Sequence, residues 1–535
     1  MDKVFGSYDY VIAGAGSAGC LLANRLSADP SVTVLLLEAG GQDDWFWIDI
    51  PVGYLYTIAN PRTDWCYKTA PDEHLAGRSI HYARGRVLGG CSSINAMIYM
   101  RGQKEDYDHW AALGNEDWSW DAVLPVFQRL EDYEHGAVES YGAGGELRVE
   151  DPRVRWEIID AWRAAAAECG IPPVKTFNSG DNAGCAYFQV NQRAGRRWSA
   201  TNAFLRPALQ RKNLTVLLHS QVQKIRFEGK QAQGVEFLKD GEALFAKASR
   251  ETILSLGSIG SPQILQLSGI GPADLLKRFE IKAVQNLPGV GENLHDHLQI
   301  RMQYKVKNVR TLNEMANSLW GKAAMGLEYL FRHTGPLTMP PSQFGAFARS
   351  DPSQPTANIE WHVQPLSLDK FGDPLHPFPA ITPAVCNLRP SSRGWVRITS
   401  PDPAAYPEIK LNYLSTPEDR KVAVDGMRFT RRIMASRALQ KYEPEEYRPG
   451  IAVQTEKELE KAAGELGTTI FHPVGTCKMG SDPWAVVDDR LRVQGVDRLR
   501  VIDASVMPRI TSGNTNAPTY LIAEKGARML LEDRD

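Results

Sequence analysis

The sequence predicts an α/β protein in which a discontinuous parallel-sheet domain carries an inserted α+β domain built on an antiparallel sheet. Buried parallel strands are apolar without alternation, and stretches of this type recur at residues 32–37, 251–256 and 499–502. Between them, residues 358–364 and 395–399 alternate polar and apolar side chains, which is typical of antiparallel strands with one wet face. Proline is frequent from 336 to 407, as in sheet edges and long connections. We therefore expect one sheet assembled from distant segments and a second, mixed domain inserted between them.

The individual elements follow from apolar periodicity. Residues 8–13, 17–26 and 32–37 read as a strand, a helix and a second strand, which together form a βαβ unit. The later strands of the same type are followed by helix-like stretches at 261–267 and 518–530. Helices of the inserted domain are expected at 155–169, 313–331 and 417–439.

The composition indicates which classes of binding partner and which cellular compartment to expect. The chain has 535 residues, with 61 Lys and Arg against 63 Asp and Glu, so its net charge of -2 gives no reason to expect nucleic acid or an anionic membrane. A small neutral substrate fits better. The seven cysteines are odd in number and contain no C-x-x-C pair, which argues against a disulfide framework and a zinc site. A reducing cytoplasm is the expected compartment.

The sequence contains no sign of a membrane-spanning or secretory segment. No apolar run approaches the roughly 20 residues that span a bilayer. The chain runs from Met1 straight into a strand pattern, which leaves no room for a signal peptide. We expect a soluble, cytoplasmic protein, and peripheral docking to the inner membrane stays open.

A glycine motif lies between the first strand and its helix. Residues 14–19 read G-A-G-S-A-G, in which glycines permit a tight turn and let backbone N–H groups approach a pyrophosphate at a helix N-terminus. Glu38 closes the second strand, where an acidic side chain can bind a ribose hydroxyl pair. Strand, helix, second strand and Glu38 in this order predict a Rossmann-like dinucleotide site. The spacing alone does not distinguish FAD from NAD.

Four stretches of the chain resemble the glucose-methanol-choline (GMC) oxidoreductase family. They read LEAG at 37–40, RGRVLGGCSSINA at 84–96 and GSIGSPQILQLSGIG at 257–271, and the last runs from IFHPVGT at 470–476 through VIDAS at 501–505 to GNTNAPT at 513–519. They occur in the family's order and span nearly the whole chain. The resemblance implies that the dinucleotide is FAD.

The resemblance also implies a division of the chain. An FAD-binding domain is expected at residues 1–152, 211–302 and 466–535, with the catalytic residues in its last part, and the inserted substrate domain at 153–210 and 303–465. The expected FAD contacts are Gly14, Gly16, Ser17, Ala18, Gly19, Glu38, Ala39, Trp65, Arg84, Gly89, Gly90, Ser92, Asn95, Ala96, Met97, Val222, Asp503, Ala504, Asn516, Ala517 and Pro518.

The segment after Gly89-Gly90 bears on how the flavin is held. Its small residues and short hydrogen-bonding groups suit a flat ring lying against backbone. In some family members a histidine near this place bonds covalently to the flavin, and this chain has Ile94 there. We therefore expect non-covalent FAD.

Asp503 and the segment from Asn516 to Pro518 are expected at the flavin for separate reasons. Asp503 ends an apolar strand, where ligands bind in open α/β sheets. Asn516-Ala517-Pro518 reads as a helix start. The resemblance places this helix's N-terminus beside the flavin's pyrimidine end, where its positive dipole favours the anionic reduced ring.

His472 and Asn516 are the expected catalytic residues. His472 lies in the family's histidine motif, and an imidazole with an ordinary pKa near 6.5 is mostly neutral at cytoplasmic pH and can accept a hydroxyl proton. Asn516 matches a family position that faces this histidine across the substrate oxygen, and its amide can donate a hydrogen bond to that oxygen. A helix N-cap is the structural alternative for Asn516.

Histidines occur at two further places that could bear on the site. His295-Asp296-His297 has the alternation of a strand face, but no third ligand set accompanies it, so we expect no metal. His362, on an alternating strand of the inserted domain, either lines the pocket or packs in the core.

The predicted reaction is FAD-dependent oxidation of a primary alcohol or polyol, such as a sugar alcohol, sorbose or an aliphatic alcohol, to the carbonyl. Choline is disfavoured but stays open. Ile470 is bulkier than the valine expected in some oxidases, which favours a dehydrogenase that passes electrons to a quinone or another carrier over one that uses oxygen. The alternatives are an alcohol oxidase of the same family, and a flavin-bearing lyase or photodecarboxylase on the same fold.

Overall fold

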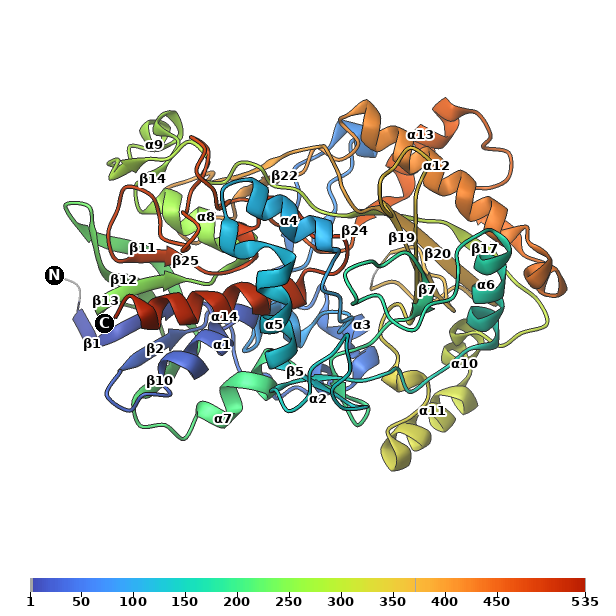
Figure 1. The fold of residues 1–535 in the computed structure, drawn as a ribbon, viewed down its shortest axis with the longest axis horizontal. Coiled ribbons are helices and arrows are strands. Elements are labelled where there is room, and N and C mark those ends of the chain that lie inside the picture. The colour runs from blue at the N-terminus through green and yellow to red at the C-terminus, as the bar shows by residue number, and fades with distance from the viewer. Residues whose placement is uncertain (1–2, 371, 535) are drawn as a thin grey trace.

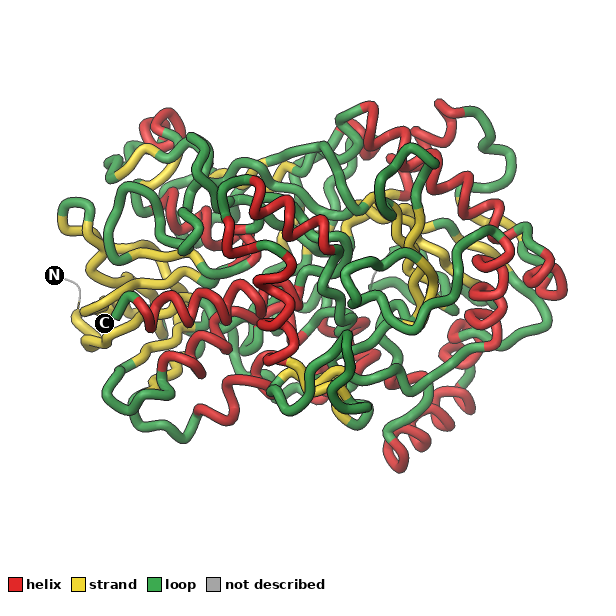
Figure 2. The backbone as a smooth tube through the Cα atoms, in the orientation of Figure 1, coloured by secondary structure: helices red, strands yellow, loops and turns green. Residues whose placement is uncertain are grey.

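Two sheets, each with its own helices, follow one another along the long axis of the molecule (Figure 1). The computed structural model describes residues 3–370 and 372–534. Figure 1 shows the first sheet at the end of the molecule where both termini lie, and the second toward the opposite end. Figure 2 shows loops and several helices between the two groups of strands. The region where ligand-binding residues are expected therefore includes many connecting segments.

The first sheet is assembled from segments that lie far apart in the chain. Within the described residues it has seven strands, in the order β10-β2-β1-β13-β12-β11, with β25 paired to β13. Their bounds are β1 (Lys3–Ala13), β2 (Val34–Leu37), β10 (Leu214–Leu217), β11 (Ser220–Glu228), β12 (Gln231–Lys239), β13 (Glu242–Leu254) and β25 (Leu499–Val501). Strands β10, β2, β1, β13 and β25 pair in parallel. This confirms the prediction that the distant apolar stretches form one parallel sheet.

Apolar side chains explain why these strands are buried. All four residues of β2 are buried, because helices cover the sheet. Helix α1 (Ser17–Leu26) packs against α14 (Asn516–Glu532), and α8 (Gly257–Leu267) follows β13. The expected helix at 261–267 begins four residues earlier, and β13 begins nine residues before the expected strand at 251–256. The first half of β13 pairs with the antiparallel β12 and carries exposed residues, so its sequence is not continuously apolar.

The second sheet is antiparallel. Within the described residues it has eight strands, in the order β23-β17-β20-β19-β18-β7, with β16 paired to both β20 and β24. Their bounds are β7 (Gly184–Tyr187), β16 (Leu298–Arg301), β17 (Gln303–Lys305), β18 (Phe344–Ala348), β19 (Ile359–Gln364), β20 (Ala380–Asn387), β23 (Glu445–Arg448) and β24 (Gly467–Thr469).

The wet face predicted for residues 358–364 is wrong. We expected one face of residues 358–364 to be wet, but all six residues of β19 are buried. The polar side chains of Glu360, His362 and Gln364 alternate along the strand because they share one face, which is directed toward a polar interior. His362 and Gln364 on this face line a cavity. By contrast β21 (Trp395–Arg397) is half-exposed, as expected, and pairs with β22 (Glu408–Lys410) outside the main sheet.

Helices cover the second sheet. Helix α12 (Pro417–Met434) packs on β20, and α6 (Glu157–Glu168) and α13 (Glu456–Leu466) pack against α12. The expected helix at 417–439 ends at Met434 and continues as the 3₁₀ helix η7 (Arg437–Tyr442). The expected helix at 313–331 is two helices, α10 (Leu312–Asn317) and α11 (Leu319–Arg332), because Ser318 is extended and its hydroxyl caps the second helix through Gly321 N–H at 3.3 Å.

The C-terminal segment connects the two sheets. Strand β24 belongs to the second sheet and β25 to the first, so residues 470–498 pass from one to the other. His472 lies three residues after β24. It is therefore placed at the junction of the two sheets.

Candidate active site

The glycine loop after β1 lies directly against a second glycine turn. A Cβ at Gly14 would lie 2.5 Å from the Ser255 carbonyl oxygen, and a Cβ at Gly90 would lie 2.7 Å from Gly16 Cα. Gly14 and Gly90 also have φ values of +97° and +54°, in the region that favours glycine. The two turns therefore leave a narrow, side-chain-free cradle at the N-terminus of α1, which suits a pyrophosphate.

Glu38 lies at the end of β2 beside this cradle. Its carboxylate accepts hydrogen bonds from Ala15 N–H at 3.0 Å and Gly40 N–H at 2.8 Å. Burial raises the pKa of Glu38 to about 7. The carboxylate lines the cavity, where ribose hydroxyls can reach it.

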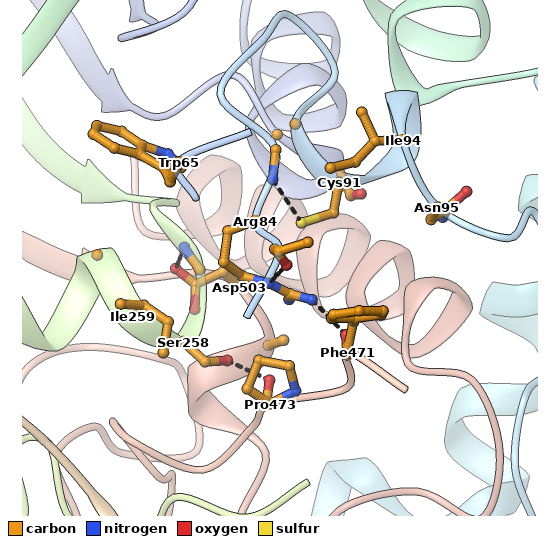
Figure 3. A pocket seen from close by; sticks show the side chains of 18 of the residues that line it. Trp65, Arg84, Cys91, Ile94, Asn95, Ser258, Ile259, Phe471, Pro473 and Asp503 are labelled. Atoms are coloured by element: carbon orange, nitrogen blue, oxygen red, sulfur yellow. Dashed lines mark hydrogen bonds between the residues drawn. The ribbon is translucent and has the colours of Figure 1, made fainter. Parts of the chain in front are cut away.

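Asn95 fixes the turn that follows the second glycine pair. Its side-chain oxygen accepts from Met97 N–H at 2.9 Å and from Arg197 Nη1 at 2.8 Å. Arg197 is itself buried and also donates to the Asn95 carbonyl at 2.8 Å. Figure 3 shows Ile94 and Asn95 following Cys91 at the wall of the cavity. This backbone is held firmly enough to support a flat ring.

Asp503 and the start of α14 form the opposite wall. Asp503 Oδ2 accepts from Gly257 N–H at 2.9 Å and from the Ser261 hydroxyl at 2.6 Å, and burial raises its pKa. Asn516, the first residue of α14, accepts from the Ser17 hydroxyl at 2.8 Å. That bond joins the N-termini of α1 and α14, so two positive helix ends face one cavity.

His472 is held as a neutral base with one defined tautomer. His297 Nε2 lies 3.1 Å from the Leu388 carbonyl, which can only accept, so this nitrogen carries the proton. In neutral His297, Nδ1 is then the acceptor, and His472 Nδ1, 3.1 Å away, must donate to it. His472 Nε2 is therefore unprotonated, and Asn514 Nδ2 lies 3.0 Å from it. Burial is the main cause that holds the pKa of His472 well below its ordinary value, and the Arg84 guanidinium lowers it further.

Backbone contacts set the position of His472. Asp296 Oδ1 accepts from His472 N–H at 2.7 Å, while its other oxygen accepts from the hydroxyls of Tyr82, Tyr413 and Thr469. Phe471, immediately before it, has a φ of +67°, an unfavourable value for a non-glycine residue. Arg84 donates to the Phe471 carbonyl at 2.5 Å, as Figure 3 shows. These contacts hold the turn that directs the imidazole into the cavity.

The amide next to His472 belongs to Asn514, whereas we expected Asn516. Asn514 lies two residues before Asn516, which begins α14, and Asn516 uses its side-chain oxygen to accept from Ser17. Asn514 Oδ1 is buried without a hydrogen-bond partner among the described residues. The expected pairing of His472 and Asn516 is therefore corrected to His472 and Asn514.

Comparison with known proteins identifies the family. Models of the GMC oxidoreductase N- and C-terminal regions match residues 8–299 and 390–523. The chain belongs to the GMC oxidoreductase family. It is 40% identical over 532 residues to an alcohol dehydrogenase [acceptor] of Pseudomonas putida, covering 99% of this chain and 96% of that one. It is 41% identical to the mitochondrial choline dehydrogenase of Homo sapiens, covering 98% and 89%.

Solved structures agree with this assignment. The pyridoxine 4-oxidase from Mesorbium loti has 33% identity and a TM-score of 0.89, covering 97% of this chain and 98% of that one. An FAD-dependent oxidoreductase from Chaetomium thermophilum has 28% identity and a TM-score of 0.91, covering 98% and 99%. This GMC oxidoreductase is an FAD flavoprotein that acts on CH–OH donors. The side-chain-free cradle and Glu38 fit that cofactor.

Most of the predicted cofactor residues line one cavity of about 280 Å³. They are Gly14, Gly16, Ser17, Ala18, Glu38, Ala39, Trp65, Arg84, Gly90, Asn95, Ala96, Met97, Val222, Asp503, Ala504 and Asn516, and His472 and Asn514 line it too. Five predicted residues lie behind its wall: Gly19, Gly89, Ser92, Ala517 and Pro518. Gly19 allows close packing of α1, since a Cβ there would lie 1.9 Å from the Gly14 carbonyl oxygen. Ser92 supports the turn by bonding to the Gly89 carbonyl at 2.6 Å.

Sequence reasoning missed the residues on the substrate-domain side of the cavity. Gln299, Ser342 and Gln364 line it together with His362, for which we had left pocket and core open. The polar alternation of 358–364 is a sequence signal for His362 and Gln364, but it does not include Gln299 and Ser342. His297 was missed as the partner of His472 because these two residues are 175 positions apart.

The three residues 295–297 have separate partners. His295 Nε2 accepts from Ile510 N–H at 2.9 Å, and its Nδ1 lies 2.6 Å from the Asn293 carbonyl. Asp296 and His297 hold His472 as described. All three act in positioning the segments around the cavity.

None of the helices in the described part of the chain combines the length and apolar character that a membrane crossing requires.

Proposed function

We propose that this enzyme oxidises a neutral primary alcohol or polyol to the carbonyl, with His472 as the base and Asn514 as its partner. The observation that carries the proposal is the unprotonated Nε2 of His472 at the cavity wall, next to an amide N–H donor. The pair can bind one hydroxyl oxygen, because the alcohol donates to Nε2 and accepts from Asn514 Nδ2.

The proton and the hydride leave the alcohol by different routes. Bound FAD would supply the acceptor for the hydride that leaves the carbinol carbon. His472 Nε2 takes the hydroxyl proton, and Asn514 holds the oxygen as the carbonyl forms. A positioned base contributes about 10²- to 10⁴-fold in rate. Because the pKa of His472 is low, the charged imidazole is unfavourable in this buried site and releases its proton readily.

The charges around the cavity support a neutral substrate. Among the described residues that line it, Glu38 and Asp503 are the only carboxylates, and both are bonded to backbone at the flavin-side loops. The substrate-domain side offers the neutral groups of Gln299, Ser342 and Gln364. No carboxylate among the described lining residues on that side would balance the cation of choline. We expect kcat/KM for a neutral primary alcohol to exceed that for choline at least about tenfold, a difference of about 1.4 kcal/mol.

Flavin bleaching tests the proposal directly. Purified enzyme is mixed anaerobically with a panel of alcohols and its visible spectrum is followed. The flavin of wild type should bleach with one class of alcohol. In His472→Ala the rate of bleaching should be lower by about 10²-fold or more, with FAD still bound. A fully loaded flavin that no alcohol bleaches, or a His472→Ala variant that reacts normally, would remove the support for this function.

We also propose that FAD is bound non-covalently and reoxidised by a quinone or another carrier. Ile94 supports the first point, since its side chain has no nucleophile. Ile470 lines the cavity beside His472 and supports the second, because its bulk restricts oxygen at the ring. Acid precipitation should release all of the flavin into solution, and Ile470→Val should raise the rate of colour return in air.

A further inference from the structure

Helix α11 carries its most apolar face away from the protein. Five large apolar side chains of this helix are more than half exposed: Leu319 (84%), Trp320 (87%), Leu327 (57%), Leu330 (67%) and Phe331 (77%). At about 100° per residue they lie, with Ala323 and Ala324, within an arc of about 140°. We define these five large side chains as the outer face of α11.

The opposite arc of the same helix holds it in place. Met325 and Tyr329 are buried, and the Tyr329 hydroxyl donates to the Gly195 carbonyl at 3.2 Å. Gly195 lies in the hairpin of β8 (Gln192–Arg193) and β9 (Arg196–Arg197). Figure 1 shows α11 projecting from the lower edge of the molecule, beyond both sheets. The outer face is thus an ordered apolar surface, whereas helices on a water-exposed surface are normally polar on this side.

Basic residues lie beside and beneath the outer face. Lys322 and Arg332 are exposed on α11, and Arg193 and Arg196 are exposed on the hairpin beneath it. The exposed acids nearby are Glu328 on α11, Glu314 on the adjoining α10, and Asp49 on α2 (Phe46–Asp49), which packs against β9. These four cations and three carboxylates leave a small excess of positive charge beside an apolar surface. Leu, Trp and Phe on one side of a helix with Lys and Arg beside them is the pattern of helices that lie in a membrane interface.

We propose that the outer face of α11 docks onto an anionic phospholipid bilayer, with the helix lying in the plane of the interface. A second copy of the chain fits less well. The helix has 14 residues and is about 21 Å long and 10 Å wide, so its footprint is roughly 200 Å². Even twice that area is half of the about 800 Å² per partner that a stable interface buries. A lipid surface needs no such area, because each apolar side chain inserts independently and the cations bind headgroups.

The cavity extends toward the same part of the molecule. Its lining includes Tyr54 and Ile58, which follow α2, and Pro341 and Ser342, which follow the 3₁₀ helix η6 (Pro336–Thr338). Helix η6 packs against α11 and against η1 (Pro51–Gly53). A docked molecule would therefore hold this wall of the cavity near the bilayer.

Vesicle flotation tests the proposal on the full-length holoenzyme. The vesicles are phosphatidylcholine alone, or phosphatidylcholine mixed with phosphatidylglycerol. The test variant is Trp320→Ser/Phe331→Ser, and the matched control is Trp484→Ser/Ile451→Ser, which removes one exposed Trp and one exposed apolar residue elsewhere. Wild type and control should float with anionic vesicles, less so as salt screens the cations. The test variant should bind at least about tenfold more weakly, with unchanged flavin content and unchanged oxidation of alcohol in solution.

Three results would overturn the proposal. Wild type that stays at the bottom of the gradient with anionic vesicles would exclude docking, and equal flotation of test variant and control would exclude α11 as the site. A wild-type dimer that the test variant converts to monomer would assign the outer face to a second copy of the chain.

Discussion

Replacing His297 should slow proton abstraction although His297 itself does not reach the substrate. In His297→Leu, His472 Nδ1 loses its acceptor at 3.1 Å and becomes a buried donor without a partner. Leaving a buried donor unsatisfied costs about 1–3 kcal/mol. If the tautomer with Nδ1–H loses that much, the fraction of His472 with a free Nε2 and the rate of flavin bleaching fall roughly 5- to 150-fold.

His297→Gln is the matched control. A glutamine carbonyl can accept from His472 Nδ1–H while its amide donates to the Leu388 carbonyl, so this variant should recover most of the lost rate. The assay is anaerobic stopped-flow bleaching with saturating alcohol, accompanied by flavin content and thermal unfolding. His297→Leu bleaching within about twofold of wild type, in a folded and loaded enzyme, would refute the tautomer argument.

Three other predictions concern the same cavity. The pKa of His472 lies well below 6.5, and the neutral form is the base. We therefore expect kcat/KM to stay level from pH 8 down to 6.5 and to fall only at lower pH. A midpoint at 6.5 or above in the pH profile would contradict this. Asn514→Ala should lower kcat about 10- to 100-fold, with normal flavin content. Asn516→Ala loses the bond to Ser17 and should mainly weaken FAD retention, which is measured as flavin release. Glu38→Gln should raise the Kd for FAD about tenfold or more. In wild type the Kd should rise as pH falls below about 7, because Glu38 takes up a proton there. Titration of the apoprotein with FAD would show each effect or its absence.

Parts of the fold that depend on local sequence could be predicted. The apolar run of β2 and the glycine loop after β1 follow from strand burial and turn geometry, so the parallel sheet was foreseen. The break at Ser318 was not, because apolar periodicity continues through it and only the capping hydroxyl marks the second helix. The wet face assigned to β19 failed for a related reason: a polar side chain directed into an internal cavity gives the same alternation as one directed into water.

The arrangement of the candidate site depends on contacts between distant segments. The resemblance identified His472, but the residues that set its tautomer and position, His297 and Asp296, act through side chains more than 170 positions away. The choice between Asn514 and Asn516 depends on how the segment that leads into α14 is oriented toward His472. That orientation is set by Ser17 of α1, and no motif within either segment reveals it.

The order in which the parallel sheet is completed has a consequence for biosynthesis. Its last strand, β25, and the helix α14 come from the C-terminal region, although they pair with β13 and pack on α1. At about 5–20 residues per second, roughly 25–100 s separate synthesis of the glycine loop from synthesis of α14. From the synthesis of β13 until that of β25, the nascent chain exposes an unpaired edge at Thr252–Leu254 and lacks the α14 side of the flavin cradle. A complete cofactor site therefore forms only after α14 has been made, and chaperones that shield strand edges would act in this interval.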